Sequence, residues 1–178
     1  MRVIAGRFKG RRLKTPTWEG LRPTSDKLRE TLFNILAPRI EGARVVDGYA
    51  GTGAIGIEAL SRGAAHVTFV EHDPRAIALI ETNLAGCGAT DGYTIRRADV
   101  VAALPQLDAG APDLIVLDPP YDAEVDRVLQ AAARVVASDG LVVLERATRR
   151  QPTTPAALER VRDVVSGDST LSFFRLST

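Results

Sequence analysis

The spacing of apolar residues changes near residue 43 and divides the chain into two patterns. Before that point, leucine and isoleucine recur from Leu28 to Leu36 at the spacing of one helix face. Thr24 or Ser25 can cap this helix, and Pro38 is expected to end it. Beyond residue 43, helical segments alternate with short apolar runs that predict seven strands: Val45–Val46, His66–Glu71, Tyr93–Ala98, Asp113–Asp118, Leu141–Glu145, Val161–Ser166 and Ser169–Leu176.

This alternation predicts a doubly wound α/β fold with a mostly parallel sheet. Helices are expected over Ala54–Arg62 and Val125–Val136, and a third starts after Asp73 and stops at Gly86 or Gly88. Gly167-Asp168 is typical of a hairpin turn, so the two C-terminal strands are expected to form an antiparallel pair.

The N-terminal residues are expected to form a small β-hairpin extension of this domain. Residues 3–13 contain two short strand-like pieces around glycines, and residues 14–23 are typical of a loop. We therefore divide the chain into an N-terminal arm, residues 1–23, and a main domain, residues 24–178.

Length and composition are those of one ordinary globular domain. The chain has 178 residues, of which 45% are hydrophobic and 25% are charged. Its apolar runs are far shorter than the roughly 20 residues of a membrane span, and no apolar segment of a signal peptide follows Met1. Cys87 is the only cysteine, which excludes an internal disulfide and a multi-cysteine zinc site. A cytoplasmic protein without membrane or metal is the simplest interpretation.

The net charge of +1 is the sum of two unequal parts. Residues 1–30 carry a net charge of +6, and the rest of the chain carries −5. A basic segment on an acidic body suits a polyanionic ligand, although a solvated basic surface has the same composition. A second basic group between Arg146 and Arg162 could join the same surface or be merely solvated. The candidate nucleic-acid-binding residues, which the resemblance described below assigns to RNA, are Arg2, Arg7, Lys9, Arg11, Arg12, Lys14 and Arg22.

A glycine-rich turn follows the first predicted strand. Gly51, Gly53 and Gly56 match G-x-G-x-x-G, and Glu71 lies twenty residues beyond Gly51. This pattern is typical of a nicotinamide dinucleotide site, in which the acid binds a ribose. It also suits S-adenosylmethionine, which has the ribose and adenine without a phosphate. A tight turn without a ligand is the simplest alternative.

Two aspartates at strand ends help to separate these ligands. Asp47 would place negative charge beside the cofactor, which suits the ammonium and sulfonium groups of S-adenosylmethionine better than a pyrophosphate. Asp99 could accept a hydrogen bond from the adenine amino group. Each has a structural alternative, because Asp47 could brace the loop and Asp99 could cap the helix that starts at Val100.

The motif that indicates the chemistry is Asp118-Pro119-Pro120-Tyr121, which follows an apolar strand. Its prolines lack N–H groups and hold the chain extended, so the Asp118 carboxylate and the Pro119 carbonyl form a pair of acceptors. Such a pair can hold an exocyclic amine, aim its lone pair at a methyl sulfonium and stabilise charge on the nitrogen. Tyr121 can stack on the base. A rigid loop without a ligand is the alternative.

These motifs resemble those of a known enzyme class. Asp118–Tyr121 resembles motif IV, and Asp47–Gly53 resembles motif I, of the amino-directed S-adenosylmethionine-dependent methyltransferases. The closer resemblance is to the RsmD-type bacterial 16S rRNA (guanine-966-N2) methyltransferases and covers nearly the whole chain. Gly48 departs from their pattern, since a bulkier apolar residue is expected there. The resemblance rests on Val3–Gly6, Gly10–Leu13, Arg22–Thr24, Arg29–Asn34, Ala50–Gly53, Glu58–Ala64 and Gly167–Phe174.

The resemblance implies a Rossmann-like class I methyltransferase sheet and methyl transfer to the 2-amino nitrogen of a guanine. The implied partner is small-subunit ribosomal RNA or the assembling small subunit, bound with help from the N-terminal hairpin, and no oligomer is predicted. The implied catalytic residues are Asp118, Pro119, Pro120 and Tyr121. The cofactor-binding residues are expected to be Asp47, Gly48, Ala50, Gly51, Thr52, Gly53, Glu71, His72, Asp73, Asp99 and Val100.

Three other functions remain open on the sequence. A DNA adenine-N6 methyltransferase shares motif IV but generally has Asn at its first position, and this chain has no obvious target-recognition domain. A nicotinamide-dependent dehydrogenase would rest on the glycine loop alone. A non-catalytic RNA-binding assembly factor would use only the basic arm.

Overall fold

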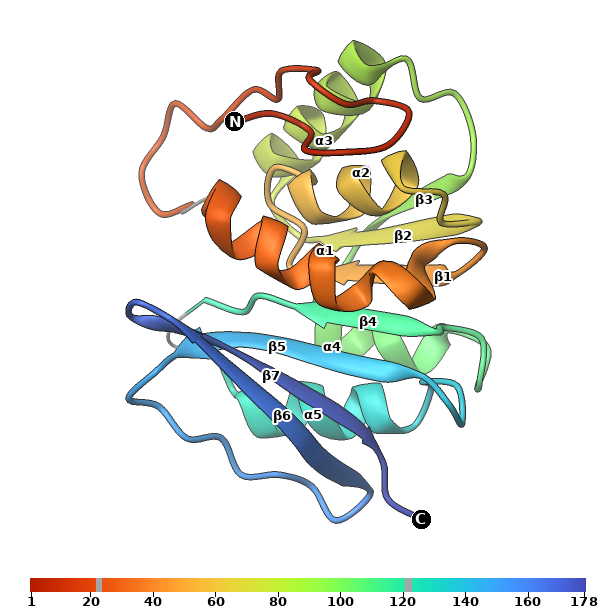
Figure 1. The fold of residues 1–178 in the computed structure, drawn as a ribbon, viewed down its shortest axis with the longest axis vertical. Coiled ribbons are helices and arrows are strands. Elements are labelled where there is room, and N and C mark those ends of the chain that lie inside the picture. The colour runs from red at the N-terminus through yellow and green to blue at the C-terminus, as the bar shows by residue number, and fades with distance from the viewer. Residues whose placement is uncertain (22–23, 121–122) are drawn as a thin grey trace.

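A seven-stranded sheet forms the centre of the computed structural model, which describes residues 1–21, 24–120 and 123–178 (Figure 1). The strand order is β3-β2-β1-β4-β5-β7-β6; the first five are parallel, and β7 is antiparallel to β5 and β6. This confirms the predicted fold class. The strands are β1 (Arg44–Gly48), β2 (His66–Glu71), β3 (Tyr93–Arg97), β4 (Leu114–Leu117), β5 (Leu141–Ala147), β6 (Leu158–Ser166) and β7 (Ser169–Leu176).

Helices cover both faces of this sheet (Figure 1). One layer holds the first three helices, and the opposite layer holds the last two with a short 3₁₀ turn, Leu104–Gln106. The helices are α1 (Asp26–Ile40), α2 (Ala54–Ser61), α3 (Pro74–Cys87), α4 (Val100–Ala103) and α5 (Val125–Ala133).

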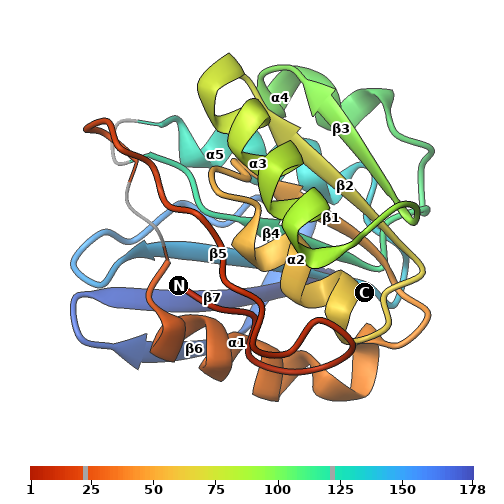
Figure 2. The same cartoon turned by 90° about the horizontal axis from the view of Figure 1, so that it is seen from above.

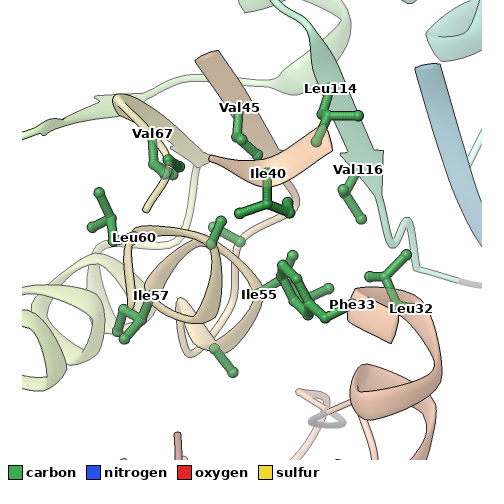
Figure 3. Close-up of a cluster of buried hydrophobic side chains, with 14 of the residues drawn as sticks. Leu32, Phe33, Ile40, Val45, Ile55, Ile57, Leu60, Val67, Leu114 and Val116 are labelled. Carbon is green, nitrogen blue, oxygen red and sulfur yellow. The ribbon is translucent and has the colours of Figure 1, made fainter. Parts of the chain in front are cut away.

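Neighbouring residues of the central strands face opposite layers. Val45 and Val116 pack with α1 and α2, whereas Val46 and Leu117 pack with α4 and α5. Both sets are buried, which explains why β4 is apolar at every position and why β1 has two consecutive valines. Figure 3 shows the first layer, in which residues of α1 (Leu32, Phe33, Ile40) and α2 (Ile55, Ile57, Leu60) form one buried cluster with Val45, Val67, Leu114 and Val116 of the sheet.

Helix ends agree with the prediction to within one residue except at the last turns of α1 and α5; α5 ends at Ala133, three residues before the predicted Val136. Ser25 caps α1, because its Oγ accepts the N–H of Leu28 at 3.2 Å. The expectation that Pro38 ends the helix is wrong, since α1 continues to Ile40. Pro38 cannot donate to the carbonyl of Asn34, but both residues are exposed, and the burial of Ile40 stabilises the last turn.

Residues 1–14 pack against the layer of α1, α2 and α3 (Figure 2). Their predicted hairpin is reduced to one antiparallel bridge, between Arg2 and Arg12, with no regular strand. Gly6 and Gly10 have φ values of 81° and 83°, which turn the chain back on itself. Several backbone N–H groups bond to helix side chains instead of a partner strand, and this keeps the pairing short.

No helix in the described ranges is long and apolar enough to cross a membrane. The same ranges contain no group of three or more His, Cys, Asp or Glu side chains that could hold a metal ion.

Candidate active site

A cavity of about 1320 Å³ opens at the carboxyl ends of β1, β2, β4 and β5. It lies where the strand order reverses between β1 and β4, the position at which open α/β sheets bind ligands. The fold therefore brings the glycine loop and the Asp118 motif to one cavity, as predicted. The predicted residues that line it are Asp47, Ala50, Gly51, Thr52, Glu71, His72, Asp73, Asp118, Pro119 and Pro120.

Glu71 is buried at the end of β2 and binds the backbone of both the glycine loop and the turn that follows β2. Its Oε2 accepts the N–H of Gly51 at 2.9 Å, and its Oε1 accepts those of His72 at 2.8 Å and Asp73 at 2.9 Å. Three donors compensate one carboxylate, which ties the glycine loop to β2. Glu71 also lines the cavity, so its predicted contact with a ribose stays open as a prediction.

Asp47 is buried at the end of β1 and braces the same loop. Its Oδ2 accepts the N–H of Gly56 at 2.8 Å, so the structural alternative for this residue is realised while the residue also lines the cavity. Burial raises the pKa of Asp47 well above its ordinary value, and the nearby carboxylates of Asp118 and Glu71 add to this shift.

The three glycines of the loop have different tasks. Gly51 and Gly53 have φ values of 56° and 77°, in the left-handed region that disfavours side chains. A Cβ on Gly56 would lie 2.3 Å from the ring of Phe69, so glycine is needed there for α2 to pack on β2. Of the three, only Gly51 is among the described residues that line the cavity.

Four predicted cofactor-binding residues are not among the described cavity-lining residues: Gly48, Gly53, Asp99 and Val100. Asp99 caps α4, because its Oδ1 accepts the N–H of Ala102 at 3.1 Å, and Val100 is buried in the core. A Cβ on Gly48 would lie 2.8 Å from Leu117 Cδ2, so Leu117 fills the space of the bulkier residue expected at position 48. Tyr121 lies outside the described residues.

Two carboxylates, Asp118 and Glu145, lie together on the β4–β5 side of the cavity. The register that pairs Leu117 with Leu144 makes the next residue of each strand a neighbour. Thr24 Oγ1 lies 3.2 Å from Asp118 Oδ2 and 3.5 Å from Glu145 Oε2. Within the described part of the chain, neither carboxylate takes part in an ion pair.

This arrangement favours protonation of the pair. Burial, and then the charge of Glu145, raise the pKa of Asp118 to about 7, while the Thr24 hydroxyl opposes the shift. Burial also raises the pKa of Glu145, against hydrogen bonds from Ser169 and Thr24. Near neutral pH, therefore, Asp118 can change its protonation state.

The last part of the N-terminal arm forms part of the cavity wall through Trp18 and Leu21. The guanidinium of Arg75 lies 5.0 Å from the centre of the Trp18 ring and 2.7 Å from Asp73. Hydrogen bonds from Arg75 lower the pKa of Asp73 to about 2. The wall thus combines an aromatic ring with a charge pair, and both cover the β2 side of the cavity.

Comparison with known proteins supplies the family. A family model described as "Conserved hypothetical protein 95" matches residues 1–175. The chain belongs to this family. It is similar to "Ribosomal RNA small subunit methyltransferase D" of Escherichia coli (strain K12), with 36% identity over 94% of this chain and 85% of that protein. It is also similar to "Putative rRNA methyltransferase YlbH" of Bacillus subtilis (strain 168), with 38% identity over 82% of each.

The solved structures agree with these relatives. "Putative methyltransferase yhhF" from Escherichia coli superposes with a TM-score of 0.87 at 30% identity, over 99% of this chain and 97% of that one. The predicted RsmD-type family and the Rossmann-like class I sheet are therefore confirmed.

In this family member, the backbone of residues 1–14 is held by side chains of α2 and α3. Glu58 accepts the N–H groups of Ile4 at 2.8 Å and Ala5 at 3.0 Å. Asn83 accepts the N–H of Lys14 at 2.7 Å and donates to the Lys14 carbonyl at 3.1 Å. Backbone is thus fixed while the basic side chains stay exposed, namely Arg2, Arg7, Lys9, Arg11, Arg12 and Lys14. Arg22 lies outside the described residues.

The second basic group is partly structural. Arg146 is buried, and its guanidinium donates to Ser172 Oγ at 2.9 Å and Asp163 Oδ2 at 3.1 Å. Arg160 approaches the same Asp163 at 3.7 Å. Arg146 therefore stabilises the contact of β5 with β7 and β6, and we do not count it among the candidate RNA-binding residues.

Several residues that line the cavity are not among the site residues predicted from the sequence. The sequence predicts Glu145 only as the last residue of a strand, Thr24 as a helix cap, and Trp18 as part of a loop. The signal for Glu145 is its position at the end of the strand predicted to follow Asp118, since parallel strands end at the same edge. Tyr49, with a φ of 61°, also lines the cavity, and burial raises its pKa to about 12.

Proposed function

We propose that this protein transfers a methyl group from S-adenosylmethionine to the exocyclic N2 of a guanine in small-subunit ribosomal RNA. One observation carries the proposal: the glycine loop and the acceptors of Asp118 and Pro119 open onto one cavity. The relatives support the reaction and the RNA substrate, because they are named as ribosomal RNA methyltransferases.

The β1–β2 side of the cavity fits a cationic cofactor. Asp47, Glu71 and Asp73 contribute carboxylates there, and Arg75, which also lines the cavity, is paired with Asp73. Gly51 presents backbone without a side chain. We expect these residues to hold the cofactor, with Glu71 at the ribose and Asp47 toward the positively charged end.

Asp118 and Pro119 are expected to bind the target amine from the β4 side. S-adenosylmethionine, held by the residues of the β1–β2 side, would supply the methyl group from its sulfonium and would be left as a neutral thioether once that methyl group is bonded to the amine nitrogen. Acceptors on the amine hydrogens direct the nitrogen lone pair and stabilise its developing positive charge. The nitrogen then loses one proton, which the ionised Asp118 carboxylate can accept because its pKa is about 7.

The exposed basic residues of the arm are expected to bind RNA phosphates, which position the substrate without reading its bases. The target guanine would have to leave its stack to enter the cavity. We propose small-subunit RNA, free or in an assembling subunit, as the partner.

A competition experiment tests the proposal against the remaining alternatives. Purified protein with labelled S-adenosylmethionine is given equal amounts of small-subunit ribosomal RNA and duplex DNA, and the modified nucleoside is identified. We expect N2-methylguanosine in the RNA, with the modified position mapped by comparing cells with and without the protein. N6-methyladenine in DNA, or binding of nicotinamide dinucleotide with no affinity for S-adenosylmethionine, would refute the proposal. Full function of an Asp118→Ala variant in cells would instead indicate an assembly factor.

A further inference from the structure

We infer that Glu145 is the residue that selects guanine, by accepting the N1–H of the target base while Asp118 binds its 2-amino group. The inference rests on the proposed function and adds a specificity-determining residue to it. It starts from the placement of Glu145 beside Asp118 on the wall of the cavity, with Thr24 within 3.5 Å of both.

The two carboxylates have more acceptor capacity than their neighbours fill. Two ionised carboxylates offer about eight lone-pair positions. The Thr24 hydroxyl has one proton and can donate to only one of them at a time, and Ser169 supplies a further hydrogen bond to Glu145. In the described ranges no ion pair compensates either group. A ligand with several N–H donors is therefore the one that fits this side of the cavity.

Among the bases, guanine has the matching edge. Its 2-amino group is next to N1–H, so two adjacent positions both donate hydrogen bonds. In adenine and cytosine, the ring nitrogen that flanks the amino group on the pairing edge is an acceptor, and a carboxylate there would face a lone pair. A second carboxylate beside Asp118 thus favours guanine and disfavours the other amino-bearing bases.

Binding of such a base would also offset the unfavourable energy of placing two buried carboxylates next to each other. In the free protein, burial raises the pKa of both carboxylates, and the charge of Glu145 adds to this shift for Asp118. N–H donors from guanine favour the ionised forms. The base and the carboxylate pair therefore compensate each other, which neither Asp118 alone nor an apolar pocket would do.

The test replaces the target guanine by 2-aminopurine, which keeps the 2-amino group but has no hydrogen on N1. Methyl transfer to both RNAs is measured at about pH 8 for the wild type, Glu145→Gln and the matched surface control Glu81→Gln. We expect the wild type and the control to prefer guanine by at least about tenfold, because a charged hydrogen bond is absent with 2-aminopurine. In Glu145→Gln the preference should fall to near one, since the amide can donate to an unprotonated N1. Cofactor affinity should not change.

The outcomes separate the two claims. A preference that stays unchanged in Glu145→Gln overturns the role of Glu145 and leaves the proposed function intact. Absence of guanine methylation by the wild type overturns both. If Glu145→Gln shows no detectable transfer, Glu145→Asp decides: a retained preference for guanine supports the inference, and a lost preference overturns it.

Discussion

The two sides of the cavity use the same chemical group in opposite ways. On the β2 side, Glu71 receives three backbone N–H groups, and its carboxylate is part of the scaffold of the glycine loop. On the β4 side, Asp118 has a Thr24 hydroxyl at 3.2 Å and Glu145 as an acidic neighbour, and its pKa rises to about 7. A carboxylate that accepts several backbone hydrogen bonds mainly fixes structure. A carboxylate with few donors around it keeps acceptor positions that a ligand can use.

This contrast predicts that variants on the two sides will fail differently. Loss of Glu71 should damage the fold of the loop and through it the binding of the cofactor. Loss of Asp118 should leave the fold and the cofactor site intact and remove the chemistry. Substitutions on the β2 side, on the β4 side and in the N-terminal arm can test whether their effects are separate.

Asp118→Ala should lower methyl transfer to ribosomal RNA by about a thousandfold, because an acceptor that acts on the developing charge is removed. Cofactor affinity, measured by calorimetry, should stay within about threefold, and stability should not fall, since the change also removes repulsion between buried carboxylates. Asp91→Ala, in an exposed loop, is the matched control. Transfer at the wild-type rate would contradict the proposed role of Asp118.

Glu71→Ala should lower the free energy of unfolding by about 2–4 kcal/mol, because three backbone donors lose their acceptor. Cofactor affinity should fall by more than about tenfold as the loop loosens. Denaturant unfolding and calorimetry measure the two effects, with exposed Glu81→Ala as the control. If Glu71→Ala were as stable as the wild type, the scaffold role of this carboxylate would be wrong.

Asp118→Asn should become more stable relative to the wild type as the pH rises from about 4 to about 7. The pKa of Asp118 in the folded protein, about 7, exceeds the ordinary value of an aspartate, so only the folded state keeps the proton over this range. Wild-type stability at this site therefore falls with rising pH, and asparagine, which does not titrate, avoids the loss. We expect the difference to grow by about 1–3 kcal/mol. Denaturant unfolding at several pH values measures it; a constant difference would show that Asp118 titrates normally.

Neutralising Lys9, Arg11 and Lys14 together should leave both sides of the cavity unchanged and alter only RNA binding. These side chains are exposed, so stability should change by less than about 0.5 kcal/mol. The slope of log affinity against log salt should decrease by about 0.9 for each RNA phosphate that the variant no longer neutralises. Arg134→Gln, at the end of α5, is the control. An unaltered slope would remove the arm from the RNA-binding surface.

The sheet could be predicted from the sequence because burial on both faces leaves a local trace. Strands such as Leu114–Leu117 are apolar at every position, and the helices between them carry caps that can be recognised, such as Asp73 before Pro74. Strand ends are less predictable, since β5 extends to Ala147 and β6 begins at Leu158 through pairing with β7. A partner strand decides where pairing stops, and its position cannot be deduced from the local sequence.

The candidate site is predictable where a motif is continuous and not where it is assembled in space. The glycine loop and the Asp118 motif are each one segment, and both reach the cavity. Glu145 has the local sequence of an ordinary strand and becomes important only through the register of β4 and β5. Asp99 has the sequence of a possible ligand, but its carboxylate caps the helix that follows it.

The attachment of residues 1–14 to α2 and α3 bears on the entropic cost of the RNA binding that we propose for the arm. Glu58, Ser61 and Asn83 hold this backbone before any RNA arrives. Ordering a flexible tail would cost about 1–2 kcal/mol for each residue fixed. Because this part of the arm is preformed, RNA bound there as we propose would have only to immobilise the exposed basic side chains. The arm and the RNA should then associate without prior folding of the arm. Electrostatic attraction should therefore govern the association rate constant.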